Sequence, residues 1–210
     1  MQRVLQVVGR FLSPTGLVLA GLCFLLPFAT VACDTPGGFG RAAPGGTTTY
    51  TGIHLITGTE PDVSPPDKVR LPAQWQDDRL GAQPLATIVV LLILVGLVAT
   101  IVLTDAGLRR ANVATAAGGA LVLLVLNQAF VTGALTSMVG DQVTTPLPAG
   151  KELKDYVNTG PGFVFCGALL FVTAIPNAIG WLLVRRGAAP PEQAQPQAQP
   201  PTTTPAVPRY

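Results

Sequence analysis

The segment Leu85–Thr104, LATIVVLLILVGLVATIVLT, decides the fold class of this chain. It carries no charged side chain, and a helix needs about 20 mostly apolar residues to cross a hydrocarbon core of roughly 30 Å. Backbone amides and carbonyls must be hydrogen-bonded within such a segment, because lipid offers them no partners. The sequence therefore predicts a transmembrane helix over residues 85–104.

Three other segments share this character, at about residues 11–32, 112–135 and 162–184. The whole chain is 49% hydrophobic and only 11% charged, whereas soluble proteins carry roughly a quarter charged residues. The sequence therefore predicts an all-α membrane protein, built as a bundle of four transmembrane helices. Its formal charge of +2 is too small to indicate a nucleic-acid partner.

Arginines set the expected orientation of the four spans. They cluster at span ends that share one side if every span crosses, and such clusters are typical of the cytoplasmic side. The clusters are Arg3 with Arg10, Arg109 with Arg110, and Arg185 with Arg186. Both termini are thus expected in the cytoplasm, with outer loops at 33–84 and 136–161 and Trp181 as an interfacial anchor.

The segments between and after the spans give weaker signals. Within the first outer loop, Thr47–Gly58 (TTTYTGIHLITG) is rich in Thr and Ile between glycines and predicts one or two short strands. In the second, Gly150–Tyr156 predicts a short helical turn. The tail, residues 187–210, is rich in Pro and Gln with few large apolar residues, so we expect it to be disordered.

The four predicted spans contain no Asp, Glu, Lys, Arg or His. Such groups mark proton relays, ion pathways and voltage sensors, so their lack argues against a pump, a proton-coupled transporter or a charge-selective channel. Three amides do occur there: Asn127, Gln128 and Asn177. We expect them to make hydrogen bonds between helices, with the amide of Asn177 serving a carbonyl freed by Pro176. The alternative is a polar lining for a small permease or pore.

His54 is the only histidine. A catalytic interpretation would pair it with Asp62 or Glu60 and with Ser64 as nucleophile, but no recognised motif spacing supports this. A lone histidine also makes a poor zinc site. We therefore expect a solvated or strand-face histidine, no enzyme activity, no cofactor and no metal.

Cys33 ends the first apolar segment and follows Thr30-Val31-Ala32, which satisfies a permissive lipobox. The apolar run of residues 11–32 is longer than the 7–15 residues typical of a signal peptide, so an uncut span is favoured. Cys33 and Cys166 are expected at similar depth, where a disulfide between them is an option. The remaining alternatives for Cys33 are a free thiol and a lipid anchor.

The first third of the chain resembles a loose group of uncharacterised bacterial polytopic membrane proteins. In that group the first span ends in Leu-Pro-Phe and then Val-x-Cys, and a Gly-x-x-Leu-x-x-Gly element follows. The matching residues here are Leu26, Pro27, Phe28, Val31, Cys33, Gly52, Leu55 and Gly58. The resemblance implies no activity, and it implies that the first span and the outer element form one unit.

Together these observations favour a non-enzymatic structural or interaction component of the bacterial cell envelope. Its expected partners are the lipid bilayer and other membrane or envelope proteins. The permease and an envelope enzyme near His54 are the two alternatives.

Overall fold

The computed structural model describes residues 13–32, 39, 42–66, 80–142, 147 and 149–187. A helix over Ser13–Leu25 comes first and ends in the 3₁₀ turn η1 (Cys23–Leu25). The elements that follow are β1 (Pro27–Ala32), β2 (Ala42–Thr51), α2 (Gly52–Thr57), β3 (Asp62–Pro66), α3 (Pro84–Val102), α4 (Ala106–Gln142), η3 (Leu153–Tyr156), β4 (Val157–Thr159) and α5 (Pro161–Gly187).

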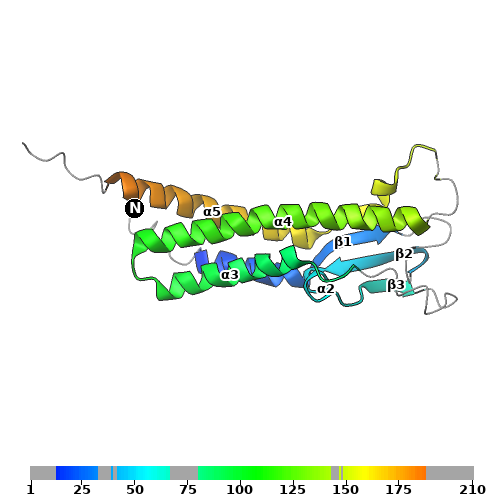
Figure 1. Cartoon of the computed structure of the whole chain (residues 1–210), viewed down its shortest axis with the longest axis horizontal. Helices are drawn as coiled ribbons and strands as arrows, with labels where there is room; N and C mark the ends of the chain where they lie inside the picture. The colour runs from blue at the N-terminus through cyan, green and yellow to red at the C-terminus, as the bar shows by residue number, and fades with distance from the viewer. Residues whose placement is uncertain are drawn as a thin grey trace, which may run out of the picture.

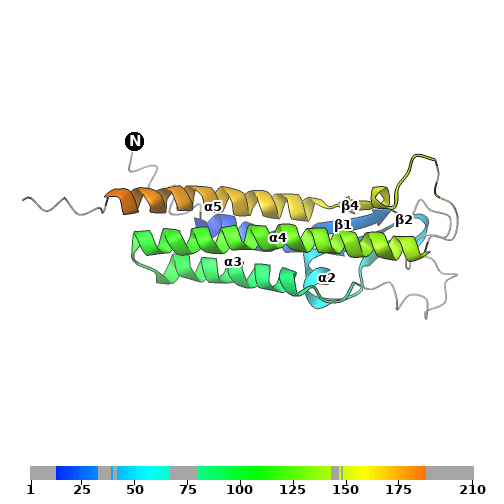
Figure 2. The same ribbon diagram turned by 45° about the horizontal axis from the view of Figure 1, so that its top comes forward.

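The helices lie side by side along the long axis of the molecule, and the sheet occupies one end of it (Figure 1). The C-terminal part of α4 continues past the other helices and packs against β1 and β4. The start of α4 and the end of α5 lie together at the opposite end, as the rotated view also shows (Figure 2). The molecule is therefore a helical bundle with a sheet at one end.

Three helices are long and apolar enough to cross a membrane: α3, α4 and α5. They coincide with the spans predicted at 85–104, 112–135 and 162–184, although α4 is considerably longer than its predicted span. The helix Ser13–Leu25 is shorter, and residues before Ser13 lie outside the described part of the chain. A bundle with three membrane-length helices and a small sheet is thus what the structure establishes.

The prediction of one helix over residues 11–32 is wrong beyond Leu25. Residues 27–32 form β1 instead, and Leu26 adopts an extended conformation with φ −87° and ψ 161°. The cause is Pro27, which lacks a backbone N–H and disfavours helical geometry in the residue before it. The apolar run therefore ends as a strand.

The sheet has the strand order β3-β2-β1-β4, with every neighbouring pair antiparallel. At the centre of β1, Val31 lies opposite Thr48 of β2 and Val157 of β4. β1 therefore pairs with one strand from each predicted outer loop: β2 from the first loop and β4 from the second.

The segment Thr47–Gly58 is a strand only as far as Thr51, so the prediction of strands through Gly58 is wrong in its second half. Residues 52–57 form α2 because Thr51 and His54 cap its first turn: the Thr51 hydroxyl accepts from His54 N at 3.3 Å, and His54 Nδ1 accepts from Thr51 N at 3.2 Å. Gly58, with φ 66°, ends the helix in the left-handed conformation that glycine favours. The turn predicted at 150–156 is η3.

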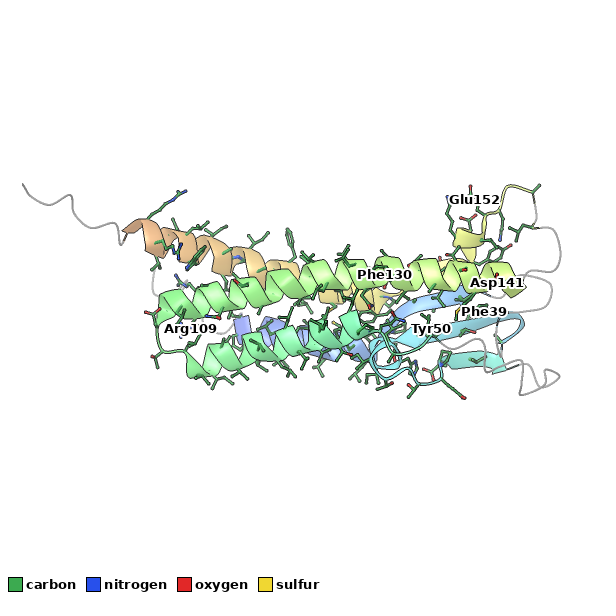
Figure 3. The ribbon with its side chains drawn as sticks, in the orientation of Figure 1. Phe39, Tyr50, Arg109, Phe130, Asp141 and Glu152 are labelled. Carbon is green, nitrogen blue, oxygen red and sulfur yellow. The ribbon has the colours of Figure 1, made fainter. Side chains whose placement is uncertain are left out.

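The outward-facing apolar side chains form a belt around the bundle. On α4, exposed large apolar side chains run from Leu108 to Phe130, a length of about 33 Å at the helical rise of 1.5 Å per residue. On α5 they run from Val164 to Val184, about 30 Å. The belt thus matches the thickness of a bilayer core, and Figure 3 shows its limits on α4 between Arg109 and Phe130.

Beyond Phe130 the character of α4 changes. Val131, Leu135 and Val139 are buried and belong to the same core cluster as Tyr50 of β2. The end of α4 therefore supports the sheet outside the apolar belt. The predicted disordered tail at 187–210 lies outside the described residues except for Gly187, which ends α5.

Candidate functional site

Gln128 lies at the junction between the bundle and the sheet. Its Nε2 donates to the Phe28 carbonyl of β1 and to the Thr159 hydroxyl of β4, both at 3.4 Å, while its Oε1 is buried without a hydrogen-bond partner. The Phe28 carbonyl also accepts from Gly160 N at 2.8 Å. A single side chain of α4 thus connects two strands where they leave the membrane-length helices.

Asn127, its neighbour, is 1% exposed, and its Oδ1 has no hydrogen-bond partner. Asn127 lies three residues after Leu124 and four before Val131, so it shares a face of α4 with these two core residues. A buried carbonyl without a partner carries a desolvation cost of about 1–3 kcal/mol.

Asn177 lies elsewhere, in the second half of α5. Its Nδ2 donates to the Ser13 hydroxyl at 2.9 Å and to the Thr173 carbonyl at 2.8 Å. It therefore links α5 to the helix Ser13–Leu25. The carbonyl that Pro176 deprives of its N–H donor is that of Val172, four residues earlier, so Asn177 does not serve the carbonyl freed by Pro176. Asn177 lies 16 residues beyond Pro161, about 24 Å along the helix from the level of Gln128. The structure does not bring Asn177 together with the other two amides, as the alternative of one polar lining would require.

His54 caps the first turn of α2. Its Nδ1 is the acceptor for Thr51 N, and within the described residues no hydrogen bond joins its ring to Asp62 or Ser64. Both of those residues are exposed on β3. The described residues also include no group of three or more His, Cys, Asp or Glu side chains that could hold a metal ion. His54, expected to be solvated or on a strand face, lies in a helix and caps its first turn.

Cys166 is a free thiol, 0% exposed, and its Sγ donates to the Ala20 carbonyl at 3.5 Å. Cys166 therefore faces the helix Ser13–Leu25, and its disulfide with Cys33, one of the options from the sequence, stays a prediction. Cys33 itself lies outside the described residues. Cys23 is also free and buried.

A groove of about 650 Å³ opens between the helix Ser13–Leu25 and α5, in the half of the belt nearer the sheet. Leucines and other apolar residues form all of its walls, and Cys23 is its least apolar member. The lining residues are Leu19, Leu22, Cys23, Leu25, Leu26, Phe165, Ala168, Leu169 and Val172. Such walls are suited to contact with hydrocarbon.

The end of the bundle away from the sheet is cationic. Arg110 Nη1 donates to the Gly180 carbonyl at 3.4 Å, and the Arg185 guanidinium lies 4.3 Å from the centre of the Trp181 ring. The arginine clusters at 109–110 and 185–186 were recognised in the sequence, but not the contact of Arg110 with α5. That contact depends on Gly180, an isolated glycine in an apolar helix that gives no sequence signal.

Two glycines at the junction were also missed. A Cβ on Gly162 would lie 2.7 Å from Phe28 Cδ2, and one on Gly160 would overlap the Pro27 carbonyl oxygen. The glycine-rich Gly160-Pro161-Gly162 was available as a sign of close backbone approach, but nothing in the sequence identifies the segment that it meets. No protein-family model, no curated protein and no solved structure matches the chain.

Proposed function

We propose that this chain is a non-enzymatic interaction component of the bacterial cell envelope, a four-span membrane protein that presents a rigid sheet on the outer side. The helix Ser13–Leu25, extended by the residues before it, would be the fourth span. Both termini would then be cytoplasmic and the sheet extracytoplasmic.

The distribution of charge supports this orientation. Among the described residues, the arginines lie at one end of the apolar belt. The described acidic residues except Asp105 lie at the other end, together with Lys151 and Lys154, and Asp141 and Glu152 are visible there in Figure 3. Positive charge beside the ends of spans favours the cytoplasmic side.

The observation that best supports the proposed role is that α4 is one continuous helix. One helix runs from the arginine end, through the apolar belt, to the core beneath the sheet. At a rise of 1.5 Å per residue, its 37 residues span about 55 Å. A sheet fixed in this way to the bundle cannot swing freely, so it is suited to holding a partner at a set position above the membrane.

The permease alternative has less support than this proposal, because Asn127 and Gln128 lie about 24 Å along the bundle from Asn177. The envelope-enzyme alternative also has less support, because His54 Nδ1 already accepts from Thr51 N.

Thiol labelling in intact cells tests the orientation. In a Cys33→Ser background the buried Cys23 and Cys166 are protected. We expect Glu152→Cys to react with a membrane-impermeant maleimide in intact cells, and Arg186→Cys only after permeabilisation. Both positions are exposed. The reverse pattern would overturn the proposed orientation.

Site-specific photocrosslinking tests the role. A photoreactive residue at the exposed positions Asn158 or Ser64 should give one discrete protein adduct in living cells, reproducible with the purified partner. The matched control is Val172 on the apolar belt, which should give no such adduct. If Asn158 and Ser64 give only monomer, or the same products as Val172, the sheet has no partner and the proposal fails.

A further inference from the structure

Four arginines meet at the end of the bundle opposite the sheet, two from the start of α4 and two from the end of α5. The two helices touch there: a Cβ on Gly107 would lie 3.5 Å from Val184 Cγ1, and Arg110 Nη1 reaches the Gly180 carbonyl at 3.4 Å. Charges far apart in the sequence are therefore neighbours on one surface.

Gly180 lets Arg110 lie flat against α5. A Cβ at this position would lie 3.2 to 3.3 Å from Arg110 Cδ, Nη1 and Nε, so any larger residue would push the guanidinium away. The bond to the Gly180 carbonyl, at 3.4 Å, is long for an N–H···O contact. A guanidinium has five N–H donors, and this half-buried one uses a single weak bond.

Arg185 lies close to the same part of α5. Its guanidinium stacks 4.3 Å from the ring centre of Trp181, the residue next to Gly180. A cation–π contact fixes the plane of the guanidinium but leaves its N–H edge open. Arg110 and Arg185 thus flank Gly180–Trp181 with donors available.

Carboxylates do not neutralise this surface. Asp105 is the only carboxylate at this end among the described residues, and its Oδ1 accepts from Leu108 N at 2.6 Å as a helix cap. The ion pair recorded within the described residues joins Lys154 and Glu152 at the far end. The arginines Arg109, Arg110, Arg185 and Arg186 therefore carry uncompensated positive charge.

We propose that this cationic end binds the phosphodiester headgroup of an anionic phospholipid, with Arg110 and Arg185 as its main donors. The position fits a lipid rather than a free anion, because the arginines begin where the exposed apolar belt ends, at Leu108 and Val184. Acyl chains can lie along the belt while the phosphate meets the guanidinium edges, which bind phosphate oxygens in pairs. This inference goes beyond the proposed function and does not depend on any partner of the sheet.

Native mass spectrometry of the full-length protein tests the site, with phosphatidylglycerol and phosphatidylcholine titrated separately. A juxtamembrane arginine contributes about 1 kcal/mol to anionic lipid binding, so R110Q and R185Q should each weaken phosphatidylglycerol binding about fivefold. The double variant should weaken it about 25-fold. Phosphatidylcholine binding should not change.

The matched control is K151Q/K154Q, which removes two cations at the sheet end and should leave phosphatidylglycerol binding unchanged. Equal binding of the two lipids by the wild type, or an equal effect of the control, would overturn the proposal. So would full displacement of phosphatidylglycerol by millimolar inorganic phosphate, which would indicate a site for a free anion. Arg185 is exposed, so R185Q keeps the fold and remains informative if R110Q does not.

Discussion

Gly160 is the position where we expect the smallest substitution to have the largest structural effect. It lies between β4 and α5, and its N–H donates to the Phe28 carbonyl at 2.8 Å. A Cβ there would overlap the Pro27 carbonyl oxygen. It would also lie 2.6 Å from the Pro27 carbonyl carbon and 3.0 Å from Phe28 N. All of these are backbone atoms, so no side-chain rotation can relieve the overlap in Gly160→Ala.

The cost has two parts. Forcing an extra methyl group into a closely packed site costs typically 1–3 kcal/mol. Separating the two backbones also stretches or breaks the hydrogen bond between Gly160 and Phe28, worth about 0.5–1.5 kcal/mol. We expect Gly160→Ala to lower the free energy of unfolding by about 2–4 kcal/mol. For a chain of this size that is a decrease in apparent melting temperature of roughly 5–15 °C.

The assay is thermal unfolding in detergent with a maleimide dye that becomes fluorescent on reaction. Cys23 and Cys166 are 7% and 0% exposed, so they react when the core opens, and a Cys33→Ser background removes the third thiol. Gly133→Ala in α4 is the matched control, because a Cβ there meets no heavy atom within 4 Å. Alanine favours the helix by about 0.5–1 kcal/mol over glycine, so the control should melt at or above wild type. A Gly160→Ala variant that melts no lower than the control would refute the reasoning.

Changes at three other places test separate parts of the fold. His54→Ala should lower the free energy of unfolding by about 0.5–1 kcal/mol, whereas His54→Gln, which can still accept from Thr51 N, should stay close to wild type; equal losses would contradict the capping role. Asn177→Leu and Ser13→Ala should show a coupling energy of about 0.6 kcal/mol in a double-mutant cycle, and additive effects would deny their hydrogen bond. Mass spectrometry of the intact protein should show that residues 1–32 are retained, because β1 joins β2 to β4 in the sheet. A product that lacks these residues and is acylated at Cys33 would refute this prediction.

The long helices were predictable because their signal is local. A charge-free apolar segment such as Leu85–Thr104 can hardly be anything but a helix in lipid, and α3 follows it within a few residues. The extension of α4 toward Gln142 was not predictable. Its residues 136–142 are less apolar and resemble a loop in hydropathy, whereas in the structure Val139 is buried in the core, which favours the helix there.

The first apolar segment shows a different limit. Hydropathy alone does not distinguish a helix from a buried strand in a short apolar run. The segment Pro27–Ala32 is equally apolar whether it forms a helix or a strand. Pro27 was the available signal, because it favours an extended Leu26. In the same way, the composition of the segment that contains Thr51 and His54 favours a strand. Its reciprocal capping bonds become apparent only in three dimensions.

Two of the amides in the apolar belt can be understood through the prolines near them. Pro27 ends the helix Ser13–Leu25 within a buried part of the chain, and the Phe28 carbonyl that follows accepts from Gln128. Pro176 lies within α5, which remains helical around it, and the Asn177 side chain one residue later donates to the Thr173 carbonyl. Irregular backbone at membrane depth is tolerated only where the protein itself supplies hydrogen bonds. Gln128 and Asn177 each donate to a backbone carbonyl, so the chain itself provides hydrogen-bond partners for these amides within its apolar helices.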